Sequence, residues 1–356
     1  MSDNSTRYRE IDVSGVPREL GRQIGEAARE EIRGFAEVAL QRVNKTVTLS
    51  REQALAIARD CVDYAKSYRP DLLDELLGMS EASAVALDEL MLLQVRNQFI
   101  PAALDAACTS FSVMANSNRA GRNLVGQNWD NDPALDEFTI VLTRRPTGKP
   151  ALMNVTQAGL IAYIGFSDAG MGVCLNTLPA PSRAVGVPHY FTVRAIYESV
   201  SLDEAANAVR SADRAISANI MLATPEGPAD LEVTLDDVRV LRANDGGVLT
   251  HTNHCLHPEL LSINEEFPEL IQSGPRLRRI DEQLKSLGDA VTVERLQSAL
   301  RDHEGHPRSI CRHTNDDPET GFWQTVFAVV IDPAERQMHV SRGTPCDHAF
   351  EVYQLS

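Results

Sequence analysis

Cys108 is the residue whose type and position point most directly to chemistry. It follows the small residues Ala106 and Ala107, at the boundary between a helical pattern and a strand-like one. A thiol has a pKa of about 8.5 in water, so a fraction of it is nucleophilic thiolate at neutral pH. A lone cysteine is more often a small buried hydrophobic residue, and the chain holds six widely spaced cysteines without a Cys-x-x-Cys pair. Position, rather than residue type, therefore singles out Cys108.

Histidines form a second concentration of reactive side chains. The segment His251-Thr-Asn-His254-Cys255-Leu-His257 contains four potential zinc ligands, and His303 and His306 add two more. Neither segment has the His-Glu-x-x-His spacing of a helical zinc site. On a strand, His251 and His254 would point to opposite faces. A metal-dependent hydrolase that uses His251, His254 and His257 is one alternative to a cysteine nucleophile, and a non-catalytic binding protein of the same fold with an inert, buried cysteine is another.

The elements that must position these residues change character near residue 100. Before it, apolar residues recur at helical spacing over 17–43 and 87–99. Ser50 and Gln53 have the spacing of a capping box, and Pro70 starts a further helix. Period-two patterns then predict strands over 109–114, 124–129, 138–144, 152–157, 171–178, 218–224, 229–235, 238–243, 247–252, 325–331 and 337–341. Further helices are expected over 190–200, 202–211, 274–287 and 293–302.

The order of these elements favours one α/β domain with a helical first third. Consecutive hairpin-like strands are typical of antiparallel sheets rather than of a doubly wound parallel sheet. The turn residues 116–123 would join the first two strands into a hairpin. Strand alternation then puts Asn128 and Asp130 on one face and Gln127 and Trp129 on the other.

Composition excludes two classes of partner. The formal net charge is −16, which argues against nucleic acid because phosphate binding needs clustered Lys and Arg. No segment reaches the roughly 20 apolar residues of a membrane helix, and residues 1–10 lack the apolar centre of a signal peptide. Scattered cysteines suit a reducing compartment. We therefore expect a cytoplasmic protein that binds neither nucleic acid nor membrane.

Five motifs occur in order along nearly the whole chain: Cys108-Thr-Ser, Gly126-Gln-Asn-Trp-Asp130, Ser217-Ala-Asn219, Thr250-His-Thr-Asn-His254 and Ser309-Ile-Cys-Arg-His313. Together they make the sequence resemble the peptidase C45 family, the relatives of acyl-coenzyme A:6-aminopenicillanic acid acyltransferase. That family belongs to the N-terminal-nucleophile (Ntn) hydrolases. The resemblance implies an α+β fold, a four-layer αββα sandwich with two antiparallel sheets between helical layers.

The resemblance also implies self-processing at the Ala107–Cys108 bond. Residues 1–107 would become a small helical chain and residues 108–356 a large β-rich chain, which together form one structural domain. The freed α-amine of Cys108, with a pKa of roughly 7.7–8.0, would act as a base for its own thiol. Attack on an amide would give a thioester on Cys108, which water resolves in a hydrolase and an amine resolves in an acyltransferase.

The remaining site residues follow from the same resemblance. Asn253 would donate to the oxyanion of the reaction, and Asp130 would either orient the new α-ammonium or hold the network of Cys108 and Ser110. Ser110 would support self-cleavage, Ser217 would line the substrate pocket, and Arg312 would bind a substrate carboxylate through its planar fork. Each also has an ordinary structural reading, as a turn, cap or strand-end residue.

The expected reaction is cleavage of a linear amide bond in a small molecule, by hydrolysis or acyl transfer. No cofactor and no metal are expected, and acyl-coenzyme A stays open as an acyl donor. The small and large chains should remain associated, because the apolar faces of the first helices need the rest of the domain to cover them. A higher homo-oligomer is left open.

Overall fold

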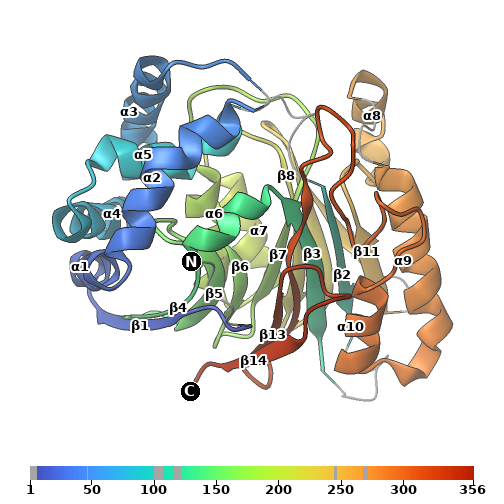
Figure 1. Ribbon diagram of the computed structural model, residues 1–356. Coiled ribbons are helices and arrows are strands. Elements are labelled where there is room, and N and C mark those ends of the chain that lie inside the picture. Colours follow the sequence, from blue (N-terminus) through green and yellow to red (C-terminus); the bar gives the residue numbers. More distant parts are fainter. Residues whose placement is uncertain (1–5, 46, 100–106, 115–121, 244–246, 268–271) are drawn as a thin grey trace.

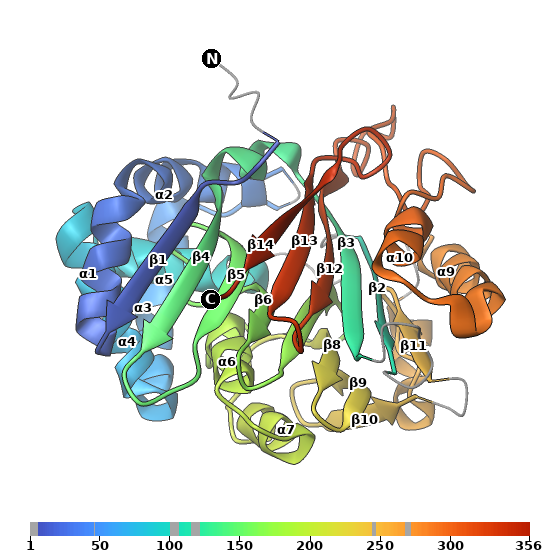
Figure 2. The same ribbon diagram turned by 90° about the horizontal axis from the view of Figure 1, so that it is seen from below.

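The polypeptide forms two sheets that lie face to face between helical layers (Figure 1). The structure is a computed structural model that describes residues 6–45, 47–99, 107–114, 122–243, 247–267 and 272–356. Helices of the first third and of the middle cover one sheet, and helices near residue 290 cover the other (Figures 1 and 2). This arrangement confirms the expected four-layer αββα sandwich.

Five helices make up most of the N-terminal third: α1 (Pro17–Ala27), α2 (Arg29–Val43), α3 (Arg51–Tyr68), α4 (Pro70–Ser83) and α5 (Leu87–Val95), followed by the short 3-10 turn η1 (Arg96–Gln98). The expected capping box at Ser50 and Gln53 is confirmed, and Pro70 begins α4. The single helical pattern over 17–43 is divided at Ala28 into two helices. Helices α1 and α4 pack very closely, because a Cβ at Gly21 would lie 1.9 Å from the Glu75 carbonyl oxygen.

The eight-stranded sheet has the order β1-β4-β5-β6-β7-β8-β9-β10. Its strands are β1 (Glu10–Gly15), β4 (Thr139–Pro146), β5 (Leu152–Gln157), β6 (Ile164–Ser167), β7 (Gly172–Thr177), β8 (Ala218–Thr224), β9 (Gly227–Val233) and β10 (Val238–Arg242). Helices α6 (His189–Tyr197) and α7 (Leu202–Arg210) lie between β7 and β8 in the sequence. The strands expected over 152–157 and 218–224 have the same bounds as β5 and β8. Strands β1 and β6 were not predicted, because their alternating stretches are short.

The antiparallel expectation does not hold for one strand pair of this sheet. Strand β1 pairs with β4 in parallel register, with Ile11 beside Leu142. A parallel pair needs a long crossover connection, and the described residues between β1 and β4 include helices α1 to α5 and two strands of the other sheet. The N-terminal segment thereby supplies the edge strand of a sheet whose other strands come from beyond residue 138.

The six-stranded sheet has the order β11-β2-β3-β12-β13-β14 and all its pairs are antiparallel. Its strands are β2 (Cys108–Val113), β3 (Leu124–Asn131), β11 (Val248–His251), β12 (Gln324–Asp332), β13 (Gln337–Arg342) and β14 (Phe350–Gln354). Strands β2 and β3 pair as expected, with Cys108 opposite Trp129. The turn expected over 116–123 lies mostly outside the described residues.

The helices that cover this second sheet are α9 (Ser273–Leu287) and α10 (Val293–Leu300), with the short elements α8 (Ile263–Glu266), η4 (Pro133–Phe138), η5 (Pro258–Leu260) and η6 (Gly288–Ala290) in the connections. Two apolar clusters report which face of β2 each side chain occupies. Cys108 and Trp129 belong to the cluster between the sheets. Phe111 and Val113 belong to the cluster beneath α9 and α10. Cys108 therefore points into the space between the two sheets.

A buried ion cluster holds the N-terminal helices against the remainder of the fold. Glu75 on α4 accepts from Arg144 Nε at 2.8 Å and from Arg194 Nη1 at 3.1 Å, and all three side chains are at most 2% exposed. Arg144 also donates to the Leu160 carbonyl at 2.7 Å. Removing one member of such a buried ion cluster strongly destabilises a protein, because the charges that remain are buried without a counter-charge.

Replacing Glu75 with alanine should lower the free energy of unfolding by about 3–5 kcal/mol, because two buried guanidinium groups lose their counter-charge. Urea unfolding in a Cys108→Ala background, which removes the expected self-cleavage, would measure this. Glu81→Ala, which removes an exposed partner of Arg18 and Arg22, should have a much smaller effect. Equal losses for the two variants would contradict the anchoring role of Glu75.

Candidate active site

Cys108 is the first residue of β2 and is 1% exposed. Burial raises the pKa of its thiol to about 12, and the negative charge of Asp130 contributes to that rise. The backbone amide of Asp130, the Gln127 side chain and the charge of Arg276 act in the opposite direction. In this intact chain the thiol is therefore protonated at neutral pH, and its reactivity depends on a change in its surroundings.

The Ala107–Cys108 peptide bond is held on both sides. The Ala107 carbonyl oxygen accepts a hydrogen bond from the Asp130 backbone amide at 3.1 Å. The Cys108 amide donates to Asn253 Oδ1 at 2.9 Å. A backbone donor thus already lies at the oxygen that would carry negative charge if the thiol added to this carbonyl.

Asn253 continues from the end of β11 and bonds beside β2. Its Nδ2 donates to the Thr177 carbonyl at 3.0 Å, and its backbone amide donates to Ser273 Oγ at 2.7 Å. The donor Cys108 N–H and the acceptor Thr177 carbonyl fix which amide atom is oxygen and which is nitrogen. Asn253 is therefore next to Cys108, as the sequence predicts, but in this state its oxygen rather than its NH₂ group faces the cysteine.

Arg276 on α9 joins these groups, and the sequence analysis did not identify it. Its Nη1 donates to the Cys108 carbonyl at 2.5 Å and to Thr109 Oγ1 at 2.9 Å, and its Nη2 donates to Asn253 Oδ1 at 2.8 Å. The residue is 2% exposed. A signal was present, because Arg276 precedes Ile280 by four residues and so lies on the buried stripe of an amphipathic helix.

Asp130 lies on the opposite face of β3 from Trp129, as strand alternation predicts. Its Oδ1 accepts from Thr325 Oγ1 at 2.7 Å, whereas its buried Oδ2 has no hydrogen-bond partner among the described residues. Burial raises the pKa of its carboxyl to about 7, and the charges of Arg276 and Arg312 oppose that rise. The carboxyl is thus poised to exchange a proton near neutrality.

Arg312 is buried close enough to Asp130 for their charges to interact. Its backbone amide donates to Thr325 Oγ1 at 3.0 Å, so one hydroxyl links it to the carboxyl of Asp130. All three guanidinium nitrogens lack hydrogen-bond partners among the described residues, and the guanidinium carbon lies 6.0 Å from the Trp323 ring centroid. A buried guanidinium with free donors suits an anionic group that is not part of the described chain.

The two predicted serines have different surroundings near Cys108. Ser110 is two residues along β2 and its Oγ accepts from Asn176 Nδ2 at 2.7 Å. Ser217 donates to the Pro181 carbonyl at 3.0 Å and lines the same small cavity as Cys108. That cavity measures about 40 Å³, which leaves room for about one water molecule. A small-molecule substrate needs a larger opening than this state provides.

A chain of buried polar side chains extends from Ser110 through the layer between the sheets. Asn176 donates to Asn219 Oδ1 at 3.0 Å, and Asn219 Nδ2 lies 2.7 Å from both carboxylate oxygens of Asp230. Asp230 in turn lies 3.9 Å from the ring of His251. Burial raises the pKa of Asp230 to about 7. Buried polar side chains thus connect β2, through Ser110, to strands β7, β8 and β9 of the other sheet.

The histidines of the 251–257 segment do not form a joint metal site. His251 Nε2 lies 2.9 Å from Glu232 Oε1, whereas His254 Nδ1 lies 2.6 Å from Ser273 Oγ. His257 Nδ1 accepts from the Glu259 amide at 3.3 Å. Among the described residues, no group of converging ligand atoms contains His254 or His257. The alternative that combines the three rings has no support in the geometry.

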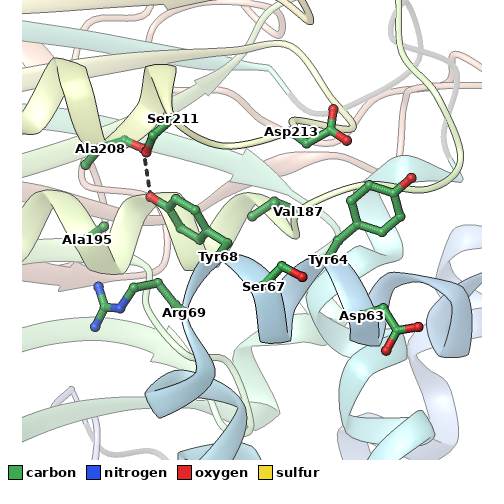
Figure 3. A pocket seen from close by; sticks show the side chains of 10 residues that line it. All are labelled: Asp63, Tyr64, Ser67, Tyr68, Arg69, Val187, Ala195, Ala208, Ser211 and Asp213. Atoms are coloured by element: carbon green, nitrogen blue, oxygen red, sulfur yellow. Dashed lines mark hydrogen bonds between the residues drawn. The ribbon is translucent and has the colours of Figure 1, made fainter.

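A larger pocket of about 800 Å³ lies between α3 and the α6–α7 region. Figure 3 shows Tyr64 and Tyr68 projecting from α3 into it, with the Tyr68 hydroxyl bonded to the Ala208 carbonyl at 2.8 Å. Its lining contains no cysteine or histidine, and Arg69 is already bonded to Asp71 at 2.6 Å. Its volume would suit a small molecule, but the reactive groups of the described residues converge at Cys108 instead.

The raised pKa of Asp130 predicts a pH-dependent difference between wild type and Asp130→Asn, again in the Cys108→Ala background. The unfolded carboxyl loses its proton near pH 4, whereas the folded one keeps it until about pH 7. The unfolded state therefore binds fewer protons in this window, and wild-type stability falls as pH rises through it. Urea unfolding should show the asparagine variant gaining stability relative to wild type from about pH 4 to about pH 7. A constant difference would mean that folded Asp130 is ionised throughout.

Comparison with known proteins shows which family this chain is similar to. The acyl-coenzyme A:6-aminopenicillanic acid acyl-transferase family model matches residues 116–347. The 40 kDa form of acyl-coenzyme A:6-aminopenicillanic-acid-acyltransferase from Emericella nidulans is 28% identical over 337 residues, which cover 94% of this chain and 92% of that protein.

Two solved structures are more distantly similar. Penicillin V acylase from Agrobacterium tumefaciens is 12% identical with a TM-score of 0.46, over 66% of this chain and 83% of that one. A mutant of conjugated bile acid hydrolase from Clostridium perfringens is 11% identical with a TM-score of 0.44, over 70% of this chain and 97% of that one. Because the family model spans more than half of the sequence, the chain belongs to the acyl-coenzyme A:6-aminopenicillanic acid acyl-transferase family.

Proposed function

We propose that this chain is the precursor of an N-terminal-cysteine enzyme that cuts its own Ala107–Cys108 bond and then cleaves a small-molecule amide. The family establishes action on amide bonds by acyl transfer or hydrolysis. The observation that carries the finer proposal is the Ala107 carbonyl oxygen, which receives the Asp130 amide hydrogen bond at 3.1 Å directly beside the buried cysteine.

In the proposed self-cleavage, Cys108 Sγ adds to the Ala107 carbonyl carbon, and the Asp130 amide stabilises the resulting oxyanion. The C–N bond then breaks, the Cys108 nitrogen takes up a proton, and the acyl group remains on sulfur as a thioester. Water hydrolyses that thioester and leaves a carboxylate on Ala107 and a free amine and thiol on Cys108. The hydrogen bond from the Cys108 nitrogen to Asn253 Oδ1 at 2.9 Å would keep the new amine in place.

In the proposed turnover, the α-amine accepts the proton of the Cys108 thiol, which then attacks the substrate amide. The oxyanion role of Asn253 would use an N–H of its Nδ2, whose other N–H is bonded to the Thr177 carbonyl in the intact chain. Ala107 packs in a small apolar cluster with Trp323, so withdrawal of the new chain end would enlarge the cavity beside Cys108. Arg312, whose three guanidinium nitrogens have no hydrogen-bond partner among the described residues, is the proposed partner for an anionic group of the substrate.

The two chains would remain together after cleavage. The first chain supplies β1 at the edge of the eight-stranded sheet and Glu75 to the buried cluster with Arg144 and Arg194. Within the described residues no helix is long and apolar enough to cross a membrane. We propose the cytoplasm as the compartment, supported by six cysteines that are all free thiols.

The proposed substrate is a linear amide of a small molecule, and water is the default acceptor because it is always present. The reaction needs no cofactor in this proposal, and acyl-coenzyme A remains open as an acyl donor.

Intact-mass spectrometry tests the self-cleavage directly. The wild type should yield two chains, one ending at Ala107 and one starting at Cys108, whereas Cys108→Ala should yield one uncut chain. Cys174→Ala is a matched control, because Cys174 is also buried in the core between the sheets, and it should be cut like the wild type. An intact wild-type chain that still hydrolyses amides would refute self-processing.

Arg276→Gln should slow the appearance of the two chains by about 10- to 100-fold, which corresponds to about 1.4–2.7 kcal/mol. The variant loses charged hydrogen bonds that hold the Cys108 carbonyl and Asn253 in position. Time-resolved mass spectrometry after synthesis measures the rate, and thermal unfolding checks that the variant is folded.

Arg278→Gln is the control, since Arg278 lies on the exposed side of the same helix, and it should process at the wild-type rate. Partial recovery by Arg276→Lys, which restores one charged donor, would support positioning by hydrogen bonds. Wild-type processing in a folded Arg276→Gln variant would exclude this role.

A further inference from the structure

Two histidines and two cysteines from separate loops converge outside the site described above. His303 Nε2 lies 3.1 Å from His313 Nε2, and the Sγ atoms of Cys311 and Cys346 each lie 3.6 Å from that same nitrogen. One ligand atom from each residue lies within 4.8 Å of all the others. The sequence analysis did not group these four residues, because His303, Cys311 and His313 come from the α10–β12 connection and Cys346 comes from the β13–β14 connection.

Hydrogen bonding does not account for this convergence. A neutral imidazole nitrogen either donates one proton or accepts one, so His313 Nε2 satisfies at most one of its three close neighbours. Cys346 Sγ has a second partner, Asp347 Oδ2 at 3.2 Å, but that bond does not explain why three ligand atoms gather around one imidazole nitrogen. A positive ion at the centre of the four atoms would satisfy all of them at once.

The spacing fits a tetrahedral zinc ion. With Zn–N bonds of about 2.0–2.1 Å and Zn–S bonds of about 2.3 Å, two nitrogens lie about 3.3 Å apart and a nitrogen and a sulfur about 3.6 Å apart. The corresponding distances here are 3.1, 3.6 and 3.6 Å. Two thiolates and two imidazoles are also the soft donor set that prefers zinc over magnesium or calcium.

We propose that His303, Cys311, His313 and Cys346 form a structural zinc site. Four protein ligands would fill the coordination sphere and leave no open position for a substrate or a catalytic water. Cys311 is buried, His313 and Cys346 are half-buried, and His303 is exposed, so an ion can enter from the His303 side. This proposal departs from the expectation that the chain binds no metal, and it is independent of the histidine segment 251–257.

The zinc site would fix the part of the chain that carries Arg312. Cys311 and His313 are its immediate neighbours, and the Arg312 amide bonds to Thr325 Oγ1, which in turn bonds to Asp130. A buried guanidinium without hydrogen-bond partners among the described residues needs its backbone held firmly. By tying this segment to Cys346 and His303, the ion would keep Arg312 beside Asp130.

Metal analysis of the untagged full chain, purified with a phosphine reductant, tests the site. We expect about one zinc ion per chain. After removal of zinc with a chelator, titration with Co²⁺ should give the visible bands of a tetrahedral site together with a thiolate-to-cobalt charge-transfer band. Both Cys346→Ser and His303→Gln should weaken Co²⁺ binding by at least about tenfold, because even partners of zinc ligands contribute that much.

Two matched controls separate loss of the site from general damage. His348→Gln changes a nearby histidine that bonds to the Thr344 carbonyl, and Cys61→Ser changes a buried cysteine on α3. Both should bind Co²⁺ like the wild type. Added Zn²⁺ should raise the thermal unfolding temperature of the wild type and of Cys108→Ala but not of Cys346→Ser, which makes the test independent of catalysis.

Three results would overturn the proposal. The first is wild-type protein without stoichiometric zinc and without a charge-transfer band on Co²⁺ titration. The second is an undiminished charge-transfer band in both Cys346→Ser and Cys311→Ser. The third is a Cys311–Cys346 disulfide in freshly purified protein kept under reductant, since it would remove both sulfur ligands.

Discussion

The geometry of the site depends on the buried guanidinium of Arg276. It donates to the Cys108 carbonyl, the Thr109 hydroxyl and the Asn253 side-chain oxygen, and thereby connects β2, the continuation of β11 and helix α9. These three segments are not adjacent along the chain. Because the donors of a guanidinium lie in one plane at fixed angles, the three acceptors are held in one relative arrangement. The Cys108 nitrogen and the Ala107 carbonyl then face Asn253 and the Asp130 amide.

Burial sets the chemistry of the intact chain. It raises the pKa of the Cys108 thiol to about 12 and that of the Asp130 carboxyl to about 7. Both groups therefore stay protonated at a higher pH than they would in water. The cavity beside the thiol has room for about one water molecule. In the proposed self-cleavage, a free α-amine on Cys108 would add a base and a new chain end at the same place.

Buried hydrogen bonds hold β2 and β3 on both faces of their sheet. On the side between the sheets, amide side chains connect Ser110 to Asn176, Asn219 and Asp230. On the helical side, Thr325 joins Asp130 to the segment that carries Arg312. The proposed zinc ligands flank Arg312 in that segment, so a structural ion there would act on the site only through the position of one residue.

The sequence by itself determined the features that depend on local order. The change from helical to period-two spacing located Cys108 at the start of a strand, Ser50 and Pro70 marked helix starts, and alternation on β3 separated Asp130 from Trp129. The order of the motifs indicated the family, since the order of motifs along a chain can be read without knowing the fold. These features need only the neighbouring residues to be known.

Only the tertiary structure decided which distant residues meet. The parallel pairing of β1 with β4 needed a crossover through most of the first third. Arg276 and the cluster of His303, Cys311, His313 and Cys346 came from contacts between segments with no shared periodicity. Conversely, the dense histidines at 251–257 diverged, because β11 ends at His251 and the chain bends before His254 and His257. Closeness in sequence therefore suggested a metal site that the geometry does not support, whereas the proposed zinc site includes Cys346, which lies far along the chain from its other three ligands.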